Sequence, residues 1–227
     1  MTSNAVIPLE SNPEVFTAFA HKLGLKASFA FHDVYSITDK DLLSFIPRPC
    51  EALICLFPIT EEYEKVRLQE ESTRKDVHNV TWFKQTVKNA CGLFALLNSI
   101  SNLSQDSYEP DSRIIQFKAV ENDVPKIEAL INEMNKEYTD AATQGETDAP
   151  DANDDTTLHF ISFIKKNGHI YELDGRRSGP YDLGESTSDG DIIDEDKLIE
   201  RFQYYISLAD DENKLNFSLM ALAPSFD

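Results

Sequence analysis

The sequence predicts an α+β fold in which helices pack on a mixed or antiparallel β-sheet. Segments with helical spacing of apolar residues and segments with strand-like alternation are interspersed, without the strict alternation typical of parallel sheets. Asn167-Gly168 lies between two strand-like runs and indicates a hairpin, which is an antiparallel unit. A chain of 227 residues can bury roughly 70% of its unfolded surface. We therefore expect residues 1–227 to form a single domain.

The first part of the chain contains both helix and strand patterns. Asn12 and Pro13 are a typical N-cap and first helical position, and apolar residues recur at helical spacing until Gly24. Alternation and a continuous apolar run predict two strands, and a charge-rich stretch predicts a further helix. The expected elements are a helix at 13–23, strands at 27–35 and 52–57, and a helix at 61–75.

Strands dominate the last part of the chain. A helix is expected after Pro125, then the hairpin from Leu158 to Gly175, and a final strand at 214–222. Residues 138–157 contain no large aliphatic residue and are rich in Asp, Ala and Thr, so they predict a long flexible loop.

Composition and charge exclude several classes of function. A net charge of −19 disfavours nucleic acid, and no apolar run approaches the ~20 residues of a membrane span. The acidity favours a partner with a basic face, with solubility alone as an equal alternative. Three cysteines and a start without a signal sequence indicate free thiols in a reducing compartment. We expect a monomer in the cytoplasm, with the nucleus as a further location.

Cys91 is the candidate nucleophile. Asn89 is a preferred N-cap residue, which would place Cys91 two positions into an apolar helix. Free N–H groups and the helix dipole can lower a cysteine pKa to about 3.5–7.5 there. The alternative is a small buried apolar residue without a chemical role.

The hairpin supplies a base for this thiol and a residue to orient that base. A two-residue turn places His159 and Asp174 diagonally on one face of the sheet, and a four-residue loop places them directly opposite. A three-residue loop would separate them. The alternatives are a histidine bonded to backbone in the core and an aspartate in a turn.

Gln85 is a candidate oxyanion donor because it lies six residues before Cys91, close enough to turn its amide toward the thiol. A surface glutamine is the alternative. The cysteines and histidines lack the spacing of a metal site, and no glycine-rich phosphate loop is present. We therefore expect no metal and no cofactor.

Three motifs together resemble the ubiquitin C-terminal hydrolases, a family of cysteine peptidases. They are KQTVKNACG with the cysteine, LHFISF with the histidine, and GHIYELDG with the aspartate. ESNPEVF, KLGL, IPRP and LFPITEEYE also resemble short single-domain members, in the expected order. The resemblance covers nearly the whole chain.

The resemblance implies a nucleophile at Cys91, a general base and acid at His159, an orienting residue at Asp174 and an oxyanion donor at Gln85. It also implies a papain-like arrangement, an antiparallel sheet between helices and a knotted chain path. Residues 138–157 would be the crossover loop that arches over the site and limits the size of the leaving group.

The implied activity is a deubiquitinating thiol hydrolase that removes small adducts and short peptides from the C-terminal glycine of ubiquitin. Another ubiquitin-like substrate, or an inactive ubiquitin-binding module, is the alternative. The residues at positions implied to hold ubiquitin are Pro8, Leu9, Glu10, Glu14, Asp33 and Leu215.

Overall fold

The computed structural model describes residues 5–152, 154 and 156–226. Its centre is a six-stranded antiparallel sheet with the strand order β1-β6-β2-β3-β4-β5. The strands are β1 (Phe29–Asp33), β2 (Ala52–Pro58), β3 (Leu158–Lys166), β4 (His169–Leu173), β5 (Tyr181–Glu185) and β6 (Ser218–Pro224). The predicted α+β class with an antiparallel sheet is confirmed.

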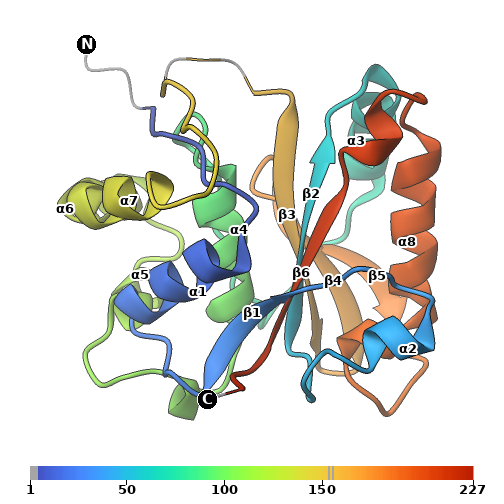
Figure 1. Cartoon of the computed structure of the whole chain (residues 1–227), viewed down its shortest axis with the longest axis horizontal. Coiled ribbons are helices and arrows are strands. Elements are labelled where there is room, and N and C mark those ends of the chain that lie inside the picture. The colour runs from blue at the N-terminus through green and yellow to red at the C-terminus, as the bar shows by residue number, and fades with distance from the viewer. Residues whose placement is uncertain (1–4, 153, 155, 227) are drawn as a thin grey trace.

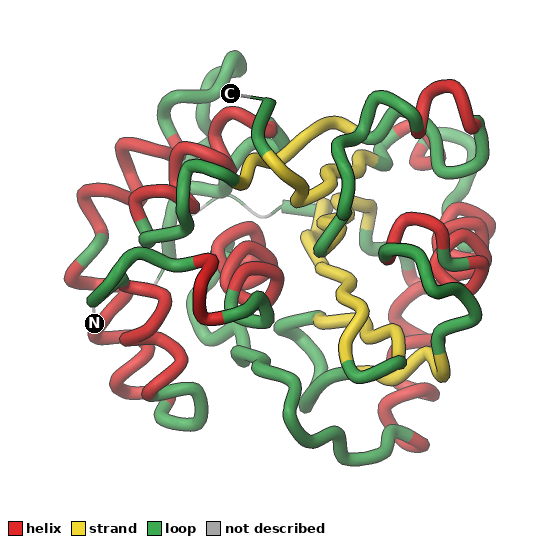
Figure 2. Tube along the Cα trace, turned by 90° about the horizontal axis from the view of Figure 1, so that it is seen from below, coloured by secondary structure: helices red, strands yellow, loops and turns green. Residues whose placement is uncertain are grey.

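Helices cover both faces of the sheet (Figure 1; Figure 2). One group is α1 (Pro13–Lys22), α4 (Cys91–Ile100), α5 (Arg113–Ala119), α6 (Val124–Glu133) and α7 (Asn135–Ala142). The other is α2 (Lys40–Leu43), α3 (Glu61–Thr73) and α8 (Asp196–Ser207). Short 3₁₀ helices lie at Gln105–Ser107, Ile192–Asp194 and Asn213–Leu215.

Each face of the sheet has its own hydrophobic core, as strand alternation requires. In β3, Phe160 and Ile164 face the core formed with α1 and α4, while Ile161 and Phe163 face the core beneath α3 and α8. Every residue of α4 is buried, and this helix packs against β2 and β3. The apolar segment after Cys91 is therefore the central helix of the fold.

Several predicted boundaries were wrong, including both ends of the strand expected at 27–35, which spans only Phe29–Asp33. Residues 138–142, expected in the loop, belong to α7, because Tyr138, Ala141 and Ala142 form a buried apolar stripe despite the absence of large aliphatic residues. The last strand begins at Ser218 rather than 214, after a 3₁₀ turn. The helix at 61–75 ends at Thr73.

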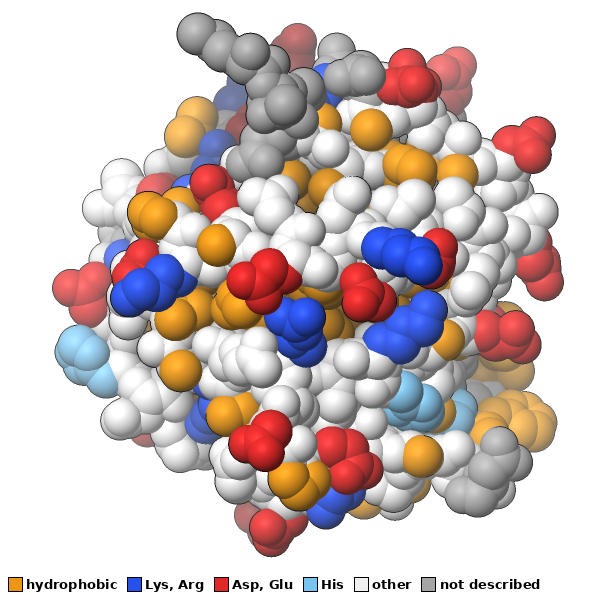
Figure 3. Space-filling view, turned by 90° about the vertical axis from the view of Figure 1, so that its left-hand side faces the viewer, with side chains coloured by type: hydrophobic (Ala, Val, Ile, Leu, Met, Phe, Trp, Pro, Cys, Tyr) orange, Lys and Arg blue, Asp and Glu red, His pale blue; other side chains and the backbone are white. Residues whose placement is uncertain are grey.

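The surface over α1 and α5–α7 mixes acidic, basic and apolar side chains (Figure 3). The net acidity of the chain is therefore not gathered on this face. None of the helices in the described part of the chain combines the length and hydrophobicity that a membrane crossing requires.

Candidate active site

Cys91 is the first residue of α4 and is only 7% exposed. The prediction that Asn89 caps this helix was wrong, since Ala90 occupies the N-cap position without a side-chain cap. Asn89 instead adopts a left-handed conformation (φ 61°), which an asparagine tolerates better than most residues. This turn directs the chain into α4 and leaves the thiol at the helix N-terminus, where N–H groups are free to meet negative charge.

The imidazole of His159 lies near the start of β3 and is 3% exposed. Its Nε2 donates a hydrogen bond of 2.7 Å to Oδ1 of Asp174. Lys166 pairs with His169, so the hairpin has the two-residue Asn167-Gly168 turn, and of the two registers left open the diagonal one is correct. The predicted contact between His159 and Asp174 is confirmed.

Asp174 is fully buried immediately after β4 and its carboxylate is held from three directions. Besides His159, the backbone N–H of Arg176 donates to Oδ1 at 2.8 Å, and the phenol of Tyr63 donates to Oδ2 at 3.1 Å. Burial alone would raise the pKa of Asp174, but the charge and hydrogen bond of His159 and the Arg176 N–H hold it well below its usual range. This carboxylate is therefore a fixed negative charge behind the imidazole.

The thiol and the imidazole form a coupled pair. Burial would lower the pKa of His159, yet the charge and hydrogen bond of Asp174, with the contact to Cys91, raise it to about 9. Burial would raise the pKa of Cys91, but the hydrogen bond and charge of His159 keep it below its ordinary value. These opposite shifts favour thiolate and imidazolium together near neutral pH.

Gln85 lies beside the Asp174 turn. Its backbone N–H donates to the carbonyl of Gly175 at 2.9 Å, and its side-chain Nε2 donates to Val87 O at 3.3 Å. A Cβ added at Gly175 would come within 2.8 Å of the Gln85 Cβ, so this approach requires glycine. Both ends of the Lys84–Cys91 segment are thus bound to the site, one through Gly175 and the other through His159.

A cavity of about 640 Å³ opens onto Cys91. Pro8, Leu9 and Glu10 line one side, and residues of the 143–157 segment, among them Thr147 and Pro150, line the other. The N-terminal segment is fixed there by a hydrogen bond from Val6 N–H to Lys88 O and by one from Tyr138 to Ile7 O. Three of the predicted substrate-binding residues therefore line the cavity onto which Cys91 opens.

A second hollow, of about 650 Å³, adjoins the first through Glu10 and Ser11 and is lined by Glu14, Asp33 and exposed aromatic residues such as Tyr35. The predicted Leu215 is 89% exposed on a 3₁₀ turn and lines neither hollow.

The crossover segment, defined here as residues 143–157, is tied down at three described points, one of which is the hydrogen bond of 2.8 Å from the Ile59 N–H to Thr157 O. The Glu10 carboxylate accepts hydrogen bonds from the backbone of Glu146 and from the backbone and hydroxyl of Thr147, which lower its pKa to about 2 although burial opposes this. The Asn89 amide donates to Ala152 O at 3.0 Å and to Asp154 O at 2.9 Å. Side chains of the N-terminal segment and of the turn before α4 therefore hold this polar segment.

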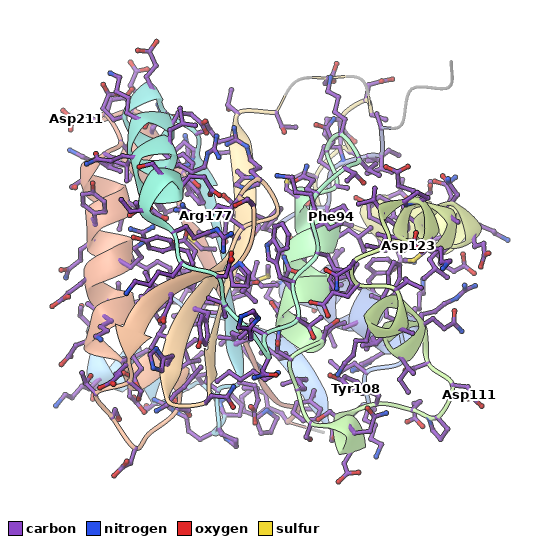
Figure 4. The ribbon with its side chains drawn as sticks, turned by 180° about the vertical axis from the view of Figure 1, so that it is seen from behind. Phe94, Tyr108, Asp111, Asp123, Arg177 and Asp211 are labelled. Carbon is purple, nitrogen blue, oxygen red and sulfur yellow. The ribbon has the colours of Figure 1, made fainter. Side chains whose placement is uncertain are left out.

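Two groups that support the site were not predicted from the sequence. Tyr63 lies in the LFPITEEYE motif, far from the catalytic motifs, and nothing in this pattern indicates a contact with Asp174. A buried ionic cluster lies between β4, α3 and α8, where Arg177 and Arg201 both bind Glu172 and Glu70. Figure 4 shows Arg177 on this side of the sheet, with Phe94 of α4 on the other. The Arg-Arg pair after Asp174 was a signal that could have indicated this cluster.

Comparison with known proteins agrees with this geometry. Residues 6–207 match the model of ubiquitin carboxyl-terminal hydrolase, family 1. The ubiquitin carboxyl-terminal hydrolase YUH1 of Saccharomyces cerevisiae is 41% identical, over 99% of this chain and 98% of its own length. The ubiquitin carboxyl-terminal hydrolase of Drosophila melanogaster is 34% identical, over 95% of this chain and 96% of its own.

Among solved structures, the fold is similar to the UCH37 catalytic domain of Trichinella spiralis, crystallised bound to ubiquitin vinyl methyl ester. The TM-score is 0.73 at 21% identity, covering 96% of this chain and 95% of that one. This structural similarity supports the fold alone. The family match and the two relatives rest on the sequence. The chain therefore belongs to ubiquitin carboxyl-terminal hydrolase family 1.

Proposed function

We propose that this chain is a ubiquitin C-terminal hydrolase in which Cys91 is the nucleophile, His159 the general acid and base, and Asp174 the residue that orients His159. The observation that carries the proposal is the buried Cys91–His159–Asp174 series, with its opposite pKa shifts, at the N-terminus of α4. Family membership and the names of the relatives identify the substrate class. Since one sheet carries both cores, we further propose that the chain is one catalytic domain.

The first half-reaction forms a thioester. The Cys91 proton passes to the nitrogen of His159 that Asp174 does not hold, and the thiolate attacks the carbonyl carbon of the C-terminal glycine. The backbone N–H of Cys91 and the amide of Gln85 stabilise the oxyanion. His159 then protonates the departing amine as the carbon–nitrogen bond breaks.

The second half-reaction releases ubiquitin. His159, now neutral, removes a proton from water, and the resulting hydroxide equivalent attacks the thioester carbonyl. Collapse of the tetrahedral intermediate breaks the carbon–sulfur bond and returns the proton to Cys91. The buried Asp174 carboxylate stabilises the imidazolium that forms in each half.

The two adjoining hollows support a slim, basic peptide tail as the occupant. The first leads to Cys91 between the N-terminal segment and the crossover segment, which suits a chain end with small residues. The second offers Glu14 and Asp33 to cationic side chains, with Glu10 between the two. Electrostatic steering of this kind weakens as salt rises.

The test is covalent capture by ubiquitin carrying a C-terminal vinyl methyl ester. We expect one adduct, located on Cys91 by mass spectrometry, and turnover of a fluorogenic ubiquitin amide. Cys91→Ala abolishes both, whereas the matched control Cys55→Ala, at a buried cysteine in β2, retains them. An adduct on another residue, or reaction only with an electrophile built on a different ubiquitin-like protein, would contradict the proposal.

A further inference from the structure

We propose that Tyr63 is a positioning residue for the reaction: its phenol holds the Asp174 carboxylate in the orientation that aligns His159 with Cys91. This inference rests on the proposed function and adds a fourth side chain to its proton-transfer apparatus. Tyr63 touches neither the thiol nor the imidazole in any hydrogen bond of the described structure, so it acts through Asp174 alone.

The position of Tyr63 is determined by the start of α3. Thr60 is the N-cap of this helix, and its hydroxyl accepts the backbone N–H of Tyr63 at 3.1 Å. The ring is 1% exposed and packs edge-on against Phe57 and Tyr205, with centroid distances of 4.8 and 5.3 Å. Neighbouring rings on two elements therefore fix the direction of the phenol O–H.

The two oxygens of Asp174 have different partners. Oδ1 accepts from His159 Nε2 at 2.7 Å and from the Arg176 N–H at 2.8 Å. Oδ2 accepts from Tyr63, and among the described residues no other hydrogen bond to this oxygen is present. The phenol therefore completes the restraint on rotation about the Cβ–Cγ bond by holding the second oxygen, and its loss would leave a buried charged oxygen unpaired.

A second contact from the same turn of α3 supports this role. Glu64, the next residue, forms an ion pair of 2.6 Å with Arg176, whose backbone N–H binds Asp174. The first turn of α3 thus holds the carboxylate through the phenol and holds the Arg176 segment through Glu64.

Several other ionisable groups face Tyr63 and Asp174. They are Arg67 from α3, Lys84 from the segment before α4, Glu172 from β4, Arg176 and Arg177 after β4, and Tyr205 from α8. Tyr205 provides a matched control, because it is an equally buried tyrosine in the same aromatic cluster whose phenol donates to Glu172 at 2.7 Å instead of to Asp174.

Without the Tyr63 hydroxyl, the Asp174 carboxylate can turn out of line with His159. The carboxylate then stabilises the protonated form of His159 less well. The pKa of His159 then falls and that of Cys91 rises, so the pH range in which both charged forms coexist becomes narrower from both sides. We expect Tyr63→Phe to reduce kcat/KM for a fluorogenic ubiquitin amide about tenfold at neutral pH, the size expected for one hydrogen bond to a buried charge.

The experiment compares Tyr63→Phe with Tyr205→Phe by the pH profile of kcat/KM and by the pH dependence of Cys91 alkylation with iodoacetamide. Tyr63→Phe should raise the apparent Cys91 pKa by about one unit, whereas Tyr205→Phe should lose thermal stability without moving it. Equal profiles for Tyr63→Phe and wild type, or equal shifts in both variants, would overturn the inference. Because alkylation needs no ubiquitin, it reports on Tyr63 even if the wild type fails to turn over the substrate, a result that would reject the proposed function instead.

Discussion

Replacing Asn89 by glycine should loosen the crossover segment without disturbing the backbone that leads into α4. The side chain donates two hydrogen bonds, of 3.0 and 2.9 Å, to the carbonyls of Ala152 and Asp154. Glycine removes both and still adopts the observed φ of 61°, whereas alanine would add strain in this left-handed conformation. The substitution therefore removes the two hydrogen bonds that tether the crossover segment and leaves the backbone turn at residue 89 intact.

The expected change in the local opening equilibrium follows from the number of hydrogen bonds that are lost. Two backbone-directed hydrogen bonds contribute about 1–3 kcal/mol net, which corresponds to roughly a 5- to 150-fold change in the equilibrium for local opening. Glu10 still binds Thr147, so we expect opening to be confined to the distal half of the segment, at 150–157. Helix α4 should not open further, because every residue in it is buried.

Hydrogen exchange followed by mass spectrometry measures this equilibrium. Peptides covering 150–157 should exchange at least about fivefold faster in Asn89→Gly, while peptides of α4 stay unchanged. Asn167→Gly is the matched control, because Asn167 has a similar φ of 53° at the hairpin turn, away from the segment. Turnover of substrates with bulky leaving groups should rise relative to that of a small amide. Unchanged exchange at 150–157 would refute the tether.

Three further predictions concern the catalytic groups and their support. Gln85→Ala should lower kcat about 10²–10³-fold with little change in KM, measured on the fluorogenic amide; a change confined to KM would contradict an oxyanion role. Because the pKa of His159 is raised to about 9 from about 6.5, its stabilising contribution is complete below pH 6.5 and is lost as pH rises through 9, so thermal stability should fall over that range. Asp174→Asn should remove this loss of thermal stability and shift the alkaline decline of activity to lower pH. An unchanged alkaline decline would argue against the His159–Asp174 pair. Glu172→Gln should cost about 3–5 kcal/mol in urea unfolding, because it removes the buried one of the two carboxylates that pair with Arg177 and Arg201; a loss below about 1 kcal/mol would contradict that account.

The sequence was sufficient to predict what depends on local periodicity and on strand parity. The Asn-Gly turn determines the parity of the hairpin, so the sequence alone could assign His159 and Asp174 to one face of the sheet. The apolar run after Cys91 likewise predicted a buried helix with the thiol at its N-terminus.

Contacts between distant segments could not be read in this way. Asn89 is a residue type that often caps helices, but its side chain donates a hydrogen bond to Ala152, 63 residues away. Which of these two roles it takes depends on where the crossover segment passes. Tyr63 and Asp174 are 111 residues apart, and only the packing of α3 beside the end of β4 unites them. The helix at 135–142 was missed because alanine and tyrosine can form a buried stripe that a search for large aliphatic residues overlooks.

The N-terminal segment, which borders the cavity at Leu9 and Glu10, has a practical consequence for handling the protein. A protease that trims the chain before Ser11 would remove part of the cavity wall and the Glu10 hold on Thr147, leaving the catalytic residues themselves untouched. Preparations of different N-terminal length should not be assumed to be equally active.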